Sequence, residues 1–249
     1  GMAETDPVGL GVGEEAVQQH DRPARANLNP GEGRAIGRGE VEDRLTEQGG
    51  SAHVEVHAFP AVGLIAGKGV SFENSFSPFP LCCPARASFM TGQYAHNHKV
   101  LWHEPPFGYG SFDDSVSLAT SLKAAGYRTG FIGKYLNRYG KDVSLVSGQP
   151  SYRYVPNGWD DWRGAVENSA GAPFHGDTYD YYDTPFNVNG TIDNRYEGVY
   201  QSKVIGDFSV DMARSFARTP DPFFMYVNYV APHHGAPSEP DEPGRVLDK

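Results

Sequence analysis

The sequence predicts an α/β fold in which a mainly parallel β-sheet is flanked by helices. Amphipathic helices alternate with short apolar strands along the chain, and parallel strands need such crossover helices. The segment PFFMYVNYV (222–230) is an almost continuous apolar run, which is typical of a strand buried on both faces.

Residues 1–58 differ in composition from the rest of the chain. Of its 249 residues, 3 are Trp, 14 Tyr and 14 Phe, yet the first aromatic residue is Phe59. The segment has 11 acidic residues against five Arg and no Lys, and its apolar residues follow neither a helical nor a strand period. It cannot bury enough apolar surface to offset the entropy of ordering. We therefore predict an irregular or disordered arm over 1–58 and a folded domain over 59–249.

Local patterns define the elements of the folded part. In chain order we expect a helix at 61–66, a strand centred on 70–76, a short helix at 84–91, a helix at 116–125, a strand at 129–133, surface loops and short strands over 141–195, a helix at 205–216 and a strand at 222–230. Pro84 favours a first helical turn, and Gly92 and Gly126 are helix stops. Apolar residues of the last helix recur along one face.

Polar groups follow two of the predicted strands. Lys134 comes directly after the strand at 129–133, and His233 and His234 come after the last strand. Ligands of parallel sheets bind beyond the carboxyl ends of the strands. We therefore expect a cation and two imidazoles on the same rim.

Charge and composition exclude several classes of protein. The net charge of −10 argues against a nucleic-acid or anionic-membrane partner, which needs clustered positive charge. No apolar run approaches the roughly 20 residues of a membrane span. A signal peptide is not visible in this chain. Two adjacent cysteines make neither a disulfide framework nor a structural zinc site.

Cys82 and Cys83 precede Pro84, Ala85 and Arg86, with Thr91-Gly92 behind them. A helix N-terminus suits a tetrahedral anion, and Arg86 adds a fixed positive charge. From position alone, a proline-capped helix with two buried cysteines and a surface arginine is the alternative.

The segment PLCCPARASFMTGQYAHNH resembles type I sulfatases, whose signature is Cys-x-Pro-x-Arg followed by Thr-Gly. In that family a dedicated enzyme converts the cysteine to formylglycine. Proline at +2 and arginine at +4 are met only from Cys82, because both positions counted from Cys83 are alanine. The resemblance covers about residues 59–245.

Two further motifs carry the resemblance. GYRTGFIGKYLN (126–137) is similar to the N-acetylglucosamine-6-sulfatase-like branch, in which the lysine of Gly-Lys contacts the sulfate; Lys134 matches it, although a solvated lysine is the plain alternative. Many family members have a histidine two residues later, where this chain has Leu136, and we expect Asn137 to supply that contact. PNGWDDWRG (156–164) and FNVNG (186–190) are also similar to that branch. The family's Pro-His fits His233 best, with His234 as the alternative.

The resemblance implies an alkaline phosphatase-like fold and hydrolysis of a sulfate ester on a sulfated sugar, such as a glycosaminoglycan, or on an aryl sulfate. Catalysis is expected from Cys82, Arg86, Lys134 and His233, with Lys134, Asn137 and His234 binding substrate. A formylglycine-generating enzyme is the implied partner, calcium the implied cofactor, and a secreted, periplasmic or lysosomal location the family habit. A phosphodiesterase or phosphonate monoester hydrolase and an inactive, anion-binding fragment are the alternatives.

The chain departs from the family pattern in its metal ligands. Family members begin with an apolar strand ending in Asp-Asp, which nothing in residues 1–58 resembles, and carry a later Asp-Asn pair that we expect to lie past Lys249. Asp113-Asp114 follows the signature and is expected to cap a helix. Only residue 82, as formylglycine, is an expected metal ligand, so we expect an incomplete domain.

Overall fold

The computed structural model describes residues 60–70, 72 and 74–235, and the predicted arm over 1–58 lies outside them. The chain divides into two compact units, residues 1–73 and 74–249. In the first unit, helix α2 (Pro60–Ala66) confirms the predicted helix. The strand expected at 70–76 is not formed by the described residues there, because none of them enters a β-ladder.

The second unit contains a five-stranded sheet in the order β4-β3-β2-β1-β5. Its strands are β1 (Arg128–Lys134), β2 (Asp161–Ala165), β3 (Phe186–Val188), β4 (Thr191–Asp193) and β5 (Phe223–Asn228). Strand β1 pairs in parallel with both β2 and β5, whereas β2–β3 and β3–β4 are antiparallel. The α/β class is confirmed, but the sheet is mixed rather than mainly parallel.

The antiparallel part of the sheet has a local cause. Only Asn189 and Gly190 separate β3 from β4, and their φ angles are 51° and 92°. Positive φ at both central residues is the requirement of a type I′ turn, for which Asn-Gly is the preferred sequence. This turn closes a tight hairpin, which makes β3 and β4 antiparallel.

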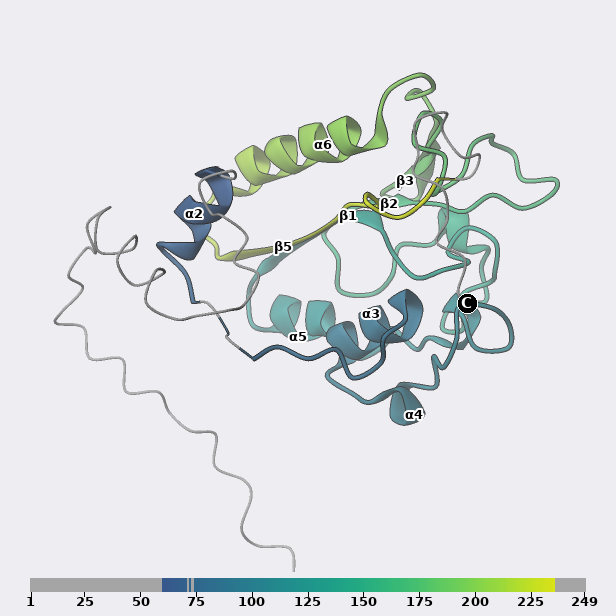
Figure 1. Cartoon of the computed structure of the whole chain (residues 1–249), viewed down its shortest axis with the longest axis horizontal. Helices are drawn as coiled ribbons and strands as arrows, with labels where there is room; N and C mark the ends of the chain where they lie inside the picture. Colours follow the sequence, from purple (N-terminus) through teal and green to yellow (C-terminus); the bar gives the residue numbers. More distant parts are fainter. Residues whose placement is uncertain (1–59, 71, 73, 236–249) are drawn as a thin grey trace, which may run out of the picture. The chain divides into compact units, whose positions relative to one another are not determined.

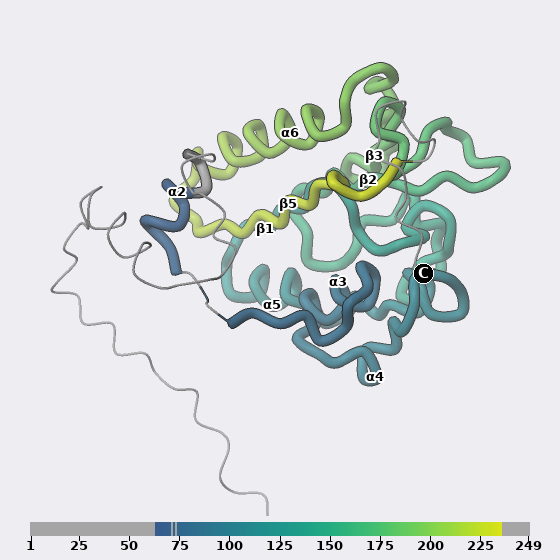
Figure 2. Tube along the Cα trace, in the orientation of Figure 1, coloured from purple at the N-terminus to yellow at the C-terminus, as the bar shows by residue number. Residues whose placement is uncertain are grey.

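Helices cover both faces of the sheet (Figures 1 and 2). Helix α6 (Gln201–Phe216) lies along one face, and α3 (Cys82–Thr91) and α5 (Leu118–Ala124) lie on the other. Neighbouring residues of β1 alternate between the two layers: Phe131 packs with residues of α3, and Ile132 packs with residues of α6. The remaining short helices are α4 (Ala95–His98), η2 (Tyr109–Ser111) and η3 (Ser151–Arg153). No helix among the described residues is long and apolar enough to cross a membrane.

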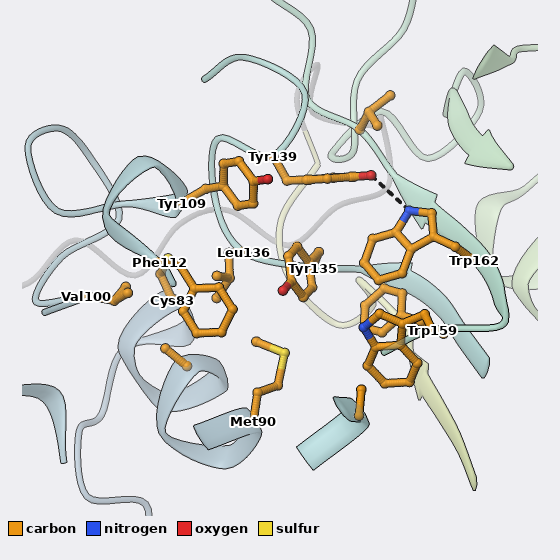
Figure 3. Packing of buried hydrophobic residues seen from close by; sticks show 14 of the residues in the cluster. Cys83, Met90, Val100, Tyr109, Phe112, Tyr135, Leu136, Tyr139, Trp159 and Trp162 are labelled. Carbon is orange, nitrogen blue, oxygen red and sulfur yellow. Dashed lines mark hydrogen bonds between the residues drawn. The ribbon is translucent and has the colours of Figure 1, made fainter. Parts of the chain in front are cut away.

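Residues 141–195 contribute to the core as well as to the surface. Trp162 of β2 is fully buried, and its Nε1–H donates to the hydroxyl of Tyr139 at 2.8 Å (Figure 3). Asn187 donates to the same hydroxyl at 2.9 Å. The prediction of surface loops and short strands was therefore wrong in part, because this segment supplies the central strand β2.

Strand β5 is less buried than its composition predicts. Phe223 is 43% exposed, and most of the strand is only partly buried. Among the described residues β5 pairs only with β1, so it forms an edge of the sheet. Burial on both faces is therefore incomplete.

The acidic pair before α5 does not cap that helix. Ser117 is the N-cap and forms a capping box with Thr120. Asp113 accepts from the backbone N–H of Ser115 at 2.9 Å, whereas Asp114 is buried and accepts from the N–H of Asn157 at 2.8 Å. Asp114 thus fastens the 154–157 loop.

A buried histidine links α3 to α4. The N–H of Val100 donates to Nδ1 of His98 at 3.1 Å, so Nδ1 carries no proton. Nε2 carries the proton and donates to the hydroxyl of Ser88 at 3.0 Å. Burial lowers the pKa of His98 below its ordinary value of 6.5. The native packing therefore requires the neutral imidazole.

We predict that the protein loses stability as the pH falls below about 6.5, because the unfolded His98 then binds a proton that the folded residue does not. His98→Gln keeps a donor and an acceptor without titrating, so it should flatten this part of the pH profile. Urea unfolding at several pH values measures the effect. His96→Gln, at an exposed position of the same helix, is the control; His96 lowers the pKa of His98 less than burial does, so this variant should change the slope far less than His98→Gln. A wild-type slope in His98→Gln would contradict the assignment.

Candidate active site

The parallel pairing of β1 with β5 brings their carboxyl ends to one rim. Gly133 lies opposite Asn228 in the register, so Lys134 and the 229–235 segment leave the sheet at the same edge. This confirms that the cation and the two histidines share a rim. The N-terminus of α3 meets the same rim from the other layer.

Two direct hydrogen bonds join four of the predicted site residues in pairs. The Cys82 thiol donates to Oδ1 of Asn137 with a sulfur–oxygen distance of 3.2 Å. Arg86, one turn further along α3, donates from Nη1 to the carbonyl oxygen of Lys134 at 2.9 Å. Cys82, Arg86, Lys134 and Asn137 are thus brought together from α3 and the end of β1.

The two cysteines occupy different environments. Cys82 is half-buried at the first position of α3. Cys83 is 0% exposed and packs in the core near Met90 and Phe112 (Figure 3). Burial raises the pKa of the Cys83 thiol to about 12. Only Cys82 therefore faces the rim as an accessible thiol.

Glycine at position 133 is required by the geometry that precedes Lys134. Its φ is +92°, and a Cβ on this residue would overlap the carbonyl oxygen of Asn228. Because the obstacle is backbone, it cannot move without separating β1 from β5. Gly133 thus lets the two strands approach closely at the rim.

Lys134 is a buried cation rather than a solvated one. The residue is 4% exposed, and its Nζ lies over the ring of Tyr179 at 4.6 Å from the centroid. No carboxylate of the described residues forms an ion pair with it. Burial lowers the pKa of the Lys134 ammonium. Its positive charge is therefore balanced by no direct ion pair within the described residues, although the buried Glu167 acts on it from further away.

The two histidines differ in their contacts. The ring of His233 lies 4.8 Å from the ring of Tyr179, which itself contacts Lys134. His234 is exposed, and its ring packs on His233 at 4.3 Å. Nδ1 of His233 donates to the carbonyl oxygen of His234 at 2.8 Å. The structure therefore places His233 against the group around Lys134 and His234 outside it.

Sequence reasoning missed Tyr179, which contacts three of the predicted residues. It also missed Glu167, a buried carboxyl 3.2 Å from the ammonium of Lys141; burial raises the pKa of Glu167. Tyr179 lies in a loop rich in tyrosine and aspartate without periodicity or a motif. No signal in the sequence distinguishes it from Tyr181 or Tyr182.

The described residues do not fit a divalent cation. No group of three His, Cys, Asp or Glu side chains within this part of the chain could hold a metal ion. The neighbours of Cys82 are an amide and two cations, whereas Ca²⁺ needs several oxygen ligands. Beyond residue 82, no ligand for the expected calcium can be named.

Comparisons with known proteins agree with the resemblance seen in the motifs. The family model described as Sulfatase matches residues 44–246. The chain is 31% identical over 185 residues to an extracellular sulfatase SULF-1 homolog of Drosophila melanogaster, covering 71% of this chain and 15% of that protein. It is also 31% identical over 179 residues to N-acetylglucosamine-6-sulfatase of Homo sapiens, covering 68% and 30%.

A solved structure, that of BT4656 in complex with its substrate D-glucosamine-2-N,6-O-disulfate, matches with 25% identity and a TM-score of 0.49. The match covers 70% of this chain and 29% of that one. The chain thus spans less than a third of the length of these three proteins.

We predict that iodoacetamide modifies Cys82 in the native, unmodified chain and reaches Cys83 only after unfolding, because Cys83 is buried. Alkylation with and without urea, located by tandem mass spectrometry, measures this. Equal labelling of both cysteines in the folded protein would show that the assignment of Cys82 to the rim is wrong.

Gly133→Ala should destabilise the fold by more than about 3 kcal/mol, because it combines a left-handed backbone with a clash against backbone. The control is Gly126→Ala, where φ is +87° but nothing lies within 4 Å of the added Cβ. That variant should lose only about 1–2 kcal/mol of stability, which is the cost of placing a non-glycine residue in a left-handed backbone conformation. Urea unfolding measures the stability of both variants. An equal loss of stability in the two would show that the close approach of Gly133 to Asn228 is not what requires glycine.

Proposed function

The chain belongs to the sulfatase family, and we propose that it hydrolyses sulfate esters of sugars through a formylglycine formed at Cys82. The observation that carries the proposal is the junction of α3 with the end of β1. There an accessible Cys82 lies beside Asn137, while Arg86 and Lys134 supply positive charge that forms no ion pair with a carboxylate of the described residues. Positive charge fixed beside an accessible side chain suits the binding of a sulfate group.

The proposed reaction is covalent at residue 82. Hydration of the aldehyde gives two hydroxyl groups on one carbon, and one of them attacks the sulfur while the bond from sulfur to the sugar oxygen breaks. The sugar leaves as an alcohol after gaining a proton. The second hydroxyl then loses its proton, the carbonyl re-forms and sulfate departs. One water is consumed and one proton released for each ester cleaved.

Arg86 and Lys134 act on the charge of the sulfuryl oxygens. Their positive groups come from rigid elements, α3 and β1, so they need little reorganisation when charge develops. His233 is proposed to protonate the leaving oxygen, since a partly exposed imidazole can exchange protons with water.

A sulfated sugar is the proposed substrate class. Support comes from the matched N-acetylglucosamine-6-sulfatase and from the match of the Gly-Lys-Tyr-Leu-Asn motif to that branch. We propose a 6-O-sulfated N-acetylglucosamine as the preferred unit, and a formylglycine-generating enzyme as the partner that modifies Cys82. Calcium remains part of the proposal for the holoenzyme, with ligands beyond residue 82 still to be identified.

Lys134→Ala in the formylglycine-bearing protein should lower kcat/KM for an aryl sulfate by about 10²–10³-fold, because it removes charge from the transition state. Lys123→Ala is the matched control, since Lys123 lies on the surface of α5 and pairs with Asp160. It should leave kcat/KM unchanged.

Three outcomes would contradict the proposal or one part of it. A wild-type rate in Lys134→Ala would remove that lysine from catalysis. Faster cleavage of an aryl phosphonate than of an aryl sulfate would favour the phosphonate hydrolase. An absence of turnover by a chain shown to carry formylglycine would favour an inactive, anion-binding fragment.

A further inference from the structure

We propose that Tyr179 is a positioning residue that holds Lys134 and Asn137 in the orientations needed beside residue 82. The inference rests on the proposed function and adds a residue that belongs to none of the sequence motifs. Tyr179 comes from the loop between β2 and β3, whereas its partners come from the end of β1.

Tyr179 contacts the site with both its hydroxyl and its ring. The hydroxyl accepts from Nδ2 of Asn137 at 2.6 Å. The Nζ atom of Lys134 lies 4.6 Å from the centroid of the Tyr179 ring, and the centroids of the Tyr179 and His233 rings are 4.8 Å apart. A single side chain thus joins three residues predicted to bind or react with the sulfate ester.

The hydroxyl gives Nδ2 of Asn137 an acceptor other than the sulfur of residue 82. An amide has a donor end and an acceptor end. Because Nδ2 is engaged by Tyr179, Oδ1 is directed to Cys82 and accepts its S–H at 3.2 Å. The same acceptor can orient a hydroxyl on the modified residue. Without the Tyr179 hydroxyl, Nδ2 loses this acceptor, and rotation of the amide would let it donate to sulfur instead.

The ring holds Lys134 without adding negative charge. A carboxylate in its place would also stabilise a buried ammonium, but it would repel an incoming sulfate. An aromatic face attracts a cation without carrying a formal charge. Burial raises the pKa of the Tyr179 phenol, so the hydroxyl stays neutral. Both contacts therefore leave the positive charge of the rim available to an anion.

Tyr179 is itself fixed by the surrounding structure. Its backbone N–H donates to Oδ1 of Asp177 at 3.1 Å. The buried side chain of Gln201, at the start of α6, donates to the carbonyl oxygen of Thr178 at 2.8 Å. The loop is thus tied to the start of α6 next to Tyr179 and is held locally by Asp177, as a positioning role requires.

The test uses the thiol form of the full chain, produced without the modifying enzyme. Tyr179→Phe keeps the ring and removes the hydroxyl, so the Asn137 amide can turn its N–H toward sulfur and stabilise the thiolate. Alkylation of Cys82 by iodoacetamide at neutral pH should then become about fivefold faster. Tyr182→Phe, in the same loop, is the control and should match the wild type. Thermal unfolding verifies that the variants are folded.

A double-mutant cycle shows whether Tyr179 acts through Asn137. In an Asn137→Ala background, Tyr179→Phe should change the alkylation rate no further. An unchanged rate in Tyr179→Phe alone, or an equal effect of Tyr179→Phe in both backgrounds, would overturn the proposal. A merely structural role would not give this pattern.

A second readout tests the contact with Lys134 by titration with inorganic sulfate. Tyr179→Leu should bind sulfate about tenfold more weakly than Tyr179→Phe, and this difference should vanish in a Lys134→Met background. Equal affinities of the Phe and Leu variants would remove the ring from the proposal. If the wild type neither binds sulfate nor turns over an ester, the proposed function fails, whereas the alkylation cycle still decides the role of Tyr179.

Discussion

The close parallel pairing of β1 with β5 is the constraint on which the site depends. It sets the end of β1 beside the segment that carries the histidines, and Gly133 permits the approach. The loop after β1 then meets the first turn of α3, where Cys82 lies. Each of these elements is packed on the sheet, so the reacting groups are positioned by the core and not by flexible loops alone.

The electrostatics of the rim are unusual for a protein with a net charge of −10. Arg86 and Lys134 lie together; Arg86 donates to the carbonyl oxygen of Lys134, and the ammonium of Lys134 lies over the ring of Tyr179. Burying positive charge without a counter-ion costs free energy. A bound sulfate would repay that cost, which connects the stability of the site with its proposed chemistry.

The sequence predicted the parts of this structure that depend on local pattern. Pro84 indicated the start of α3, which begins two residues earlier at Cys82, while apolar periodicity identified α5 and α6 and short apolar runs identified β1 and β5. Lys134 could be placed on the rim because parallel strands end at one edge.

Features that depend on tertiary contact could not be predicted. Tyr179 is one of several tyrosines in an irregular loop, and only folding shows which one meets Lys134. The segment at 70–76 has strand-like residues but finds no partner in the described sheet. Asp114 was expected to cap a helix, yet it is buried and accepts from the backbone N–H of Asn157.

The most direct measurement of the central claim is the mass of the peptide that contains residue 82, taken from protein that shows measured sulfatase turnover. We predict that the sulfur of Cys82 has been replaced by an aldehyde oxygen and that Cys83 is still a thiol. An active preparation in which Cys82 is wholly an unmodified thiol would contradict it.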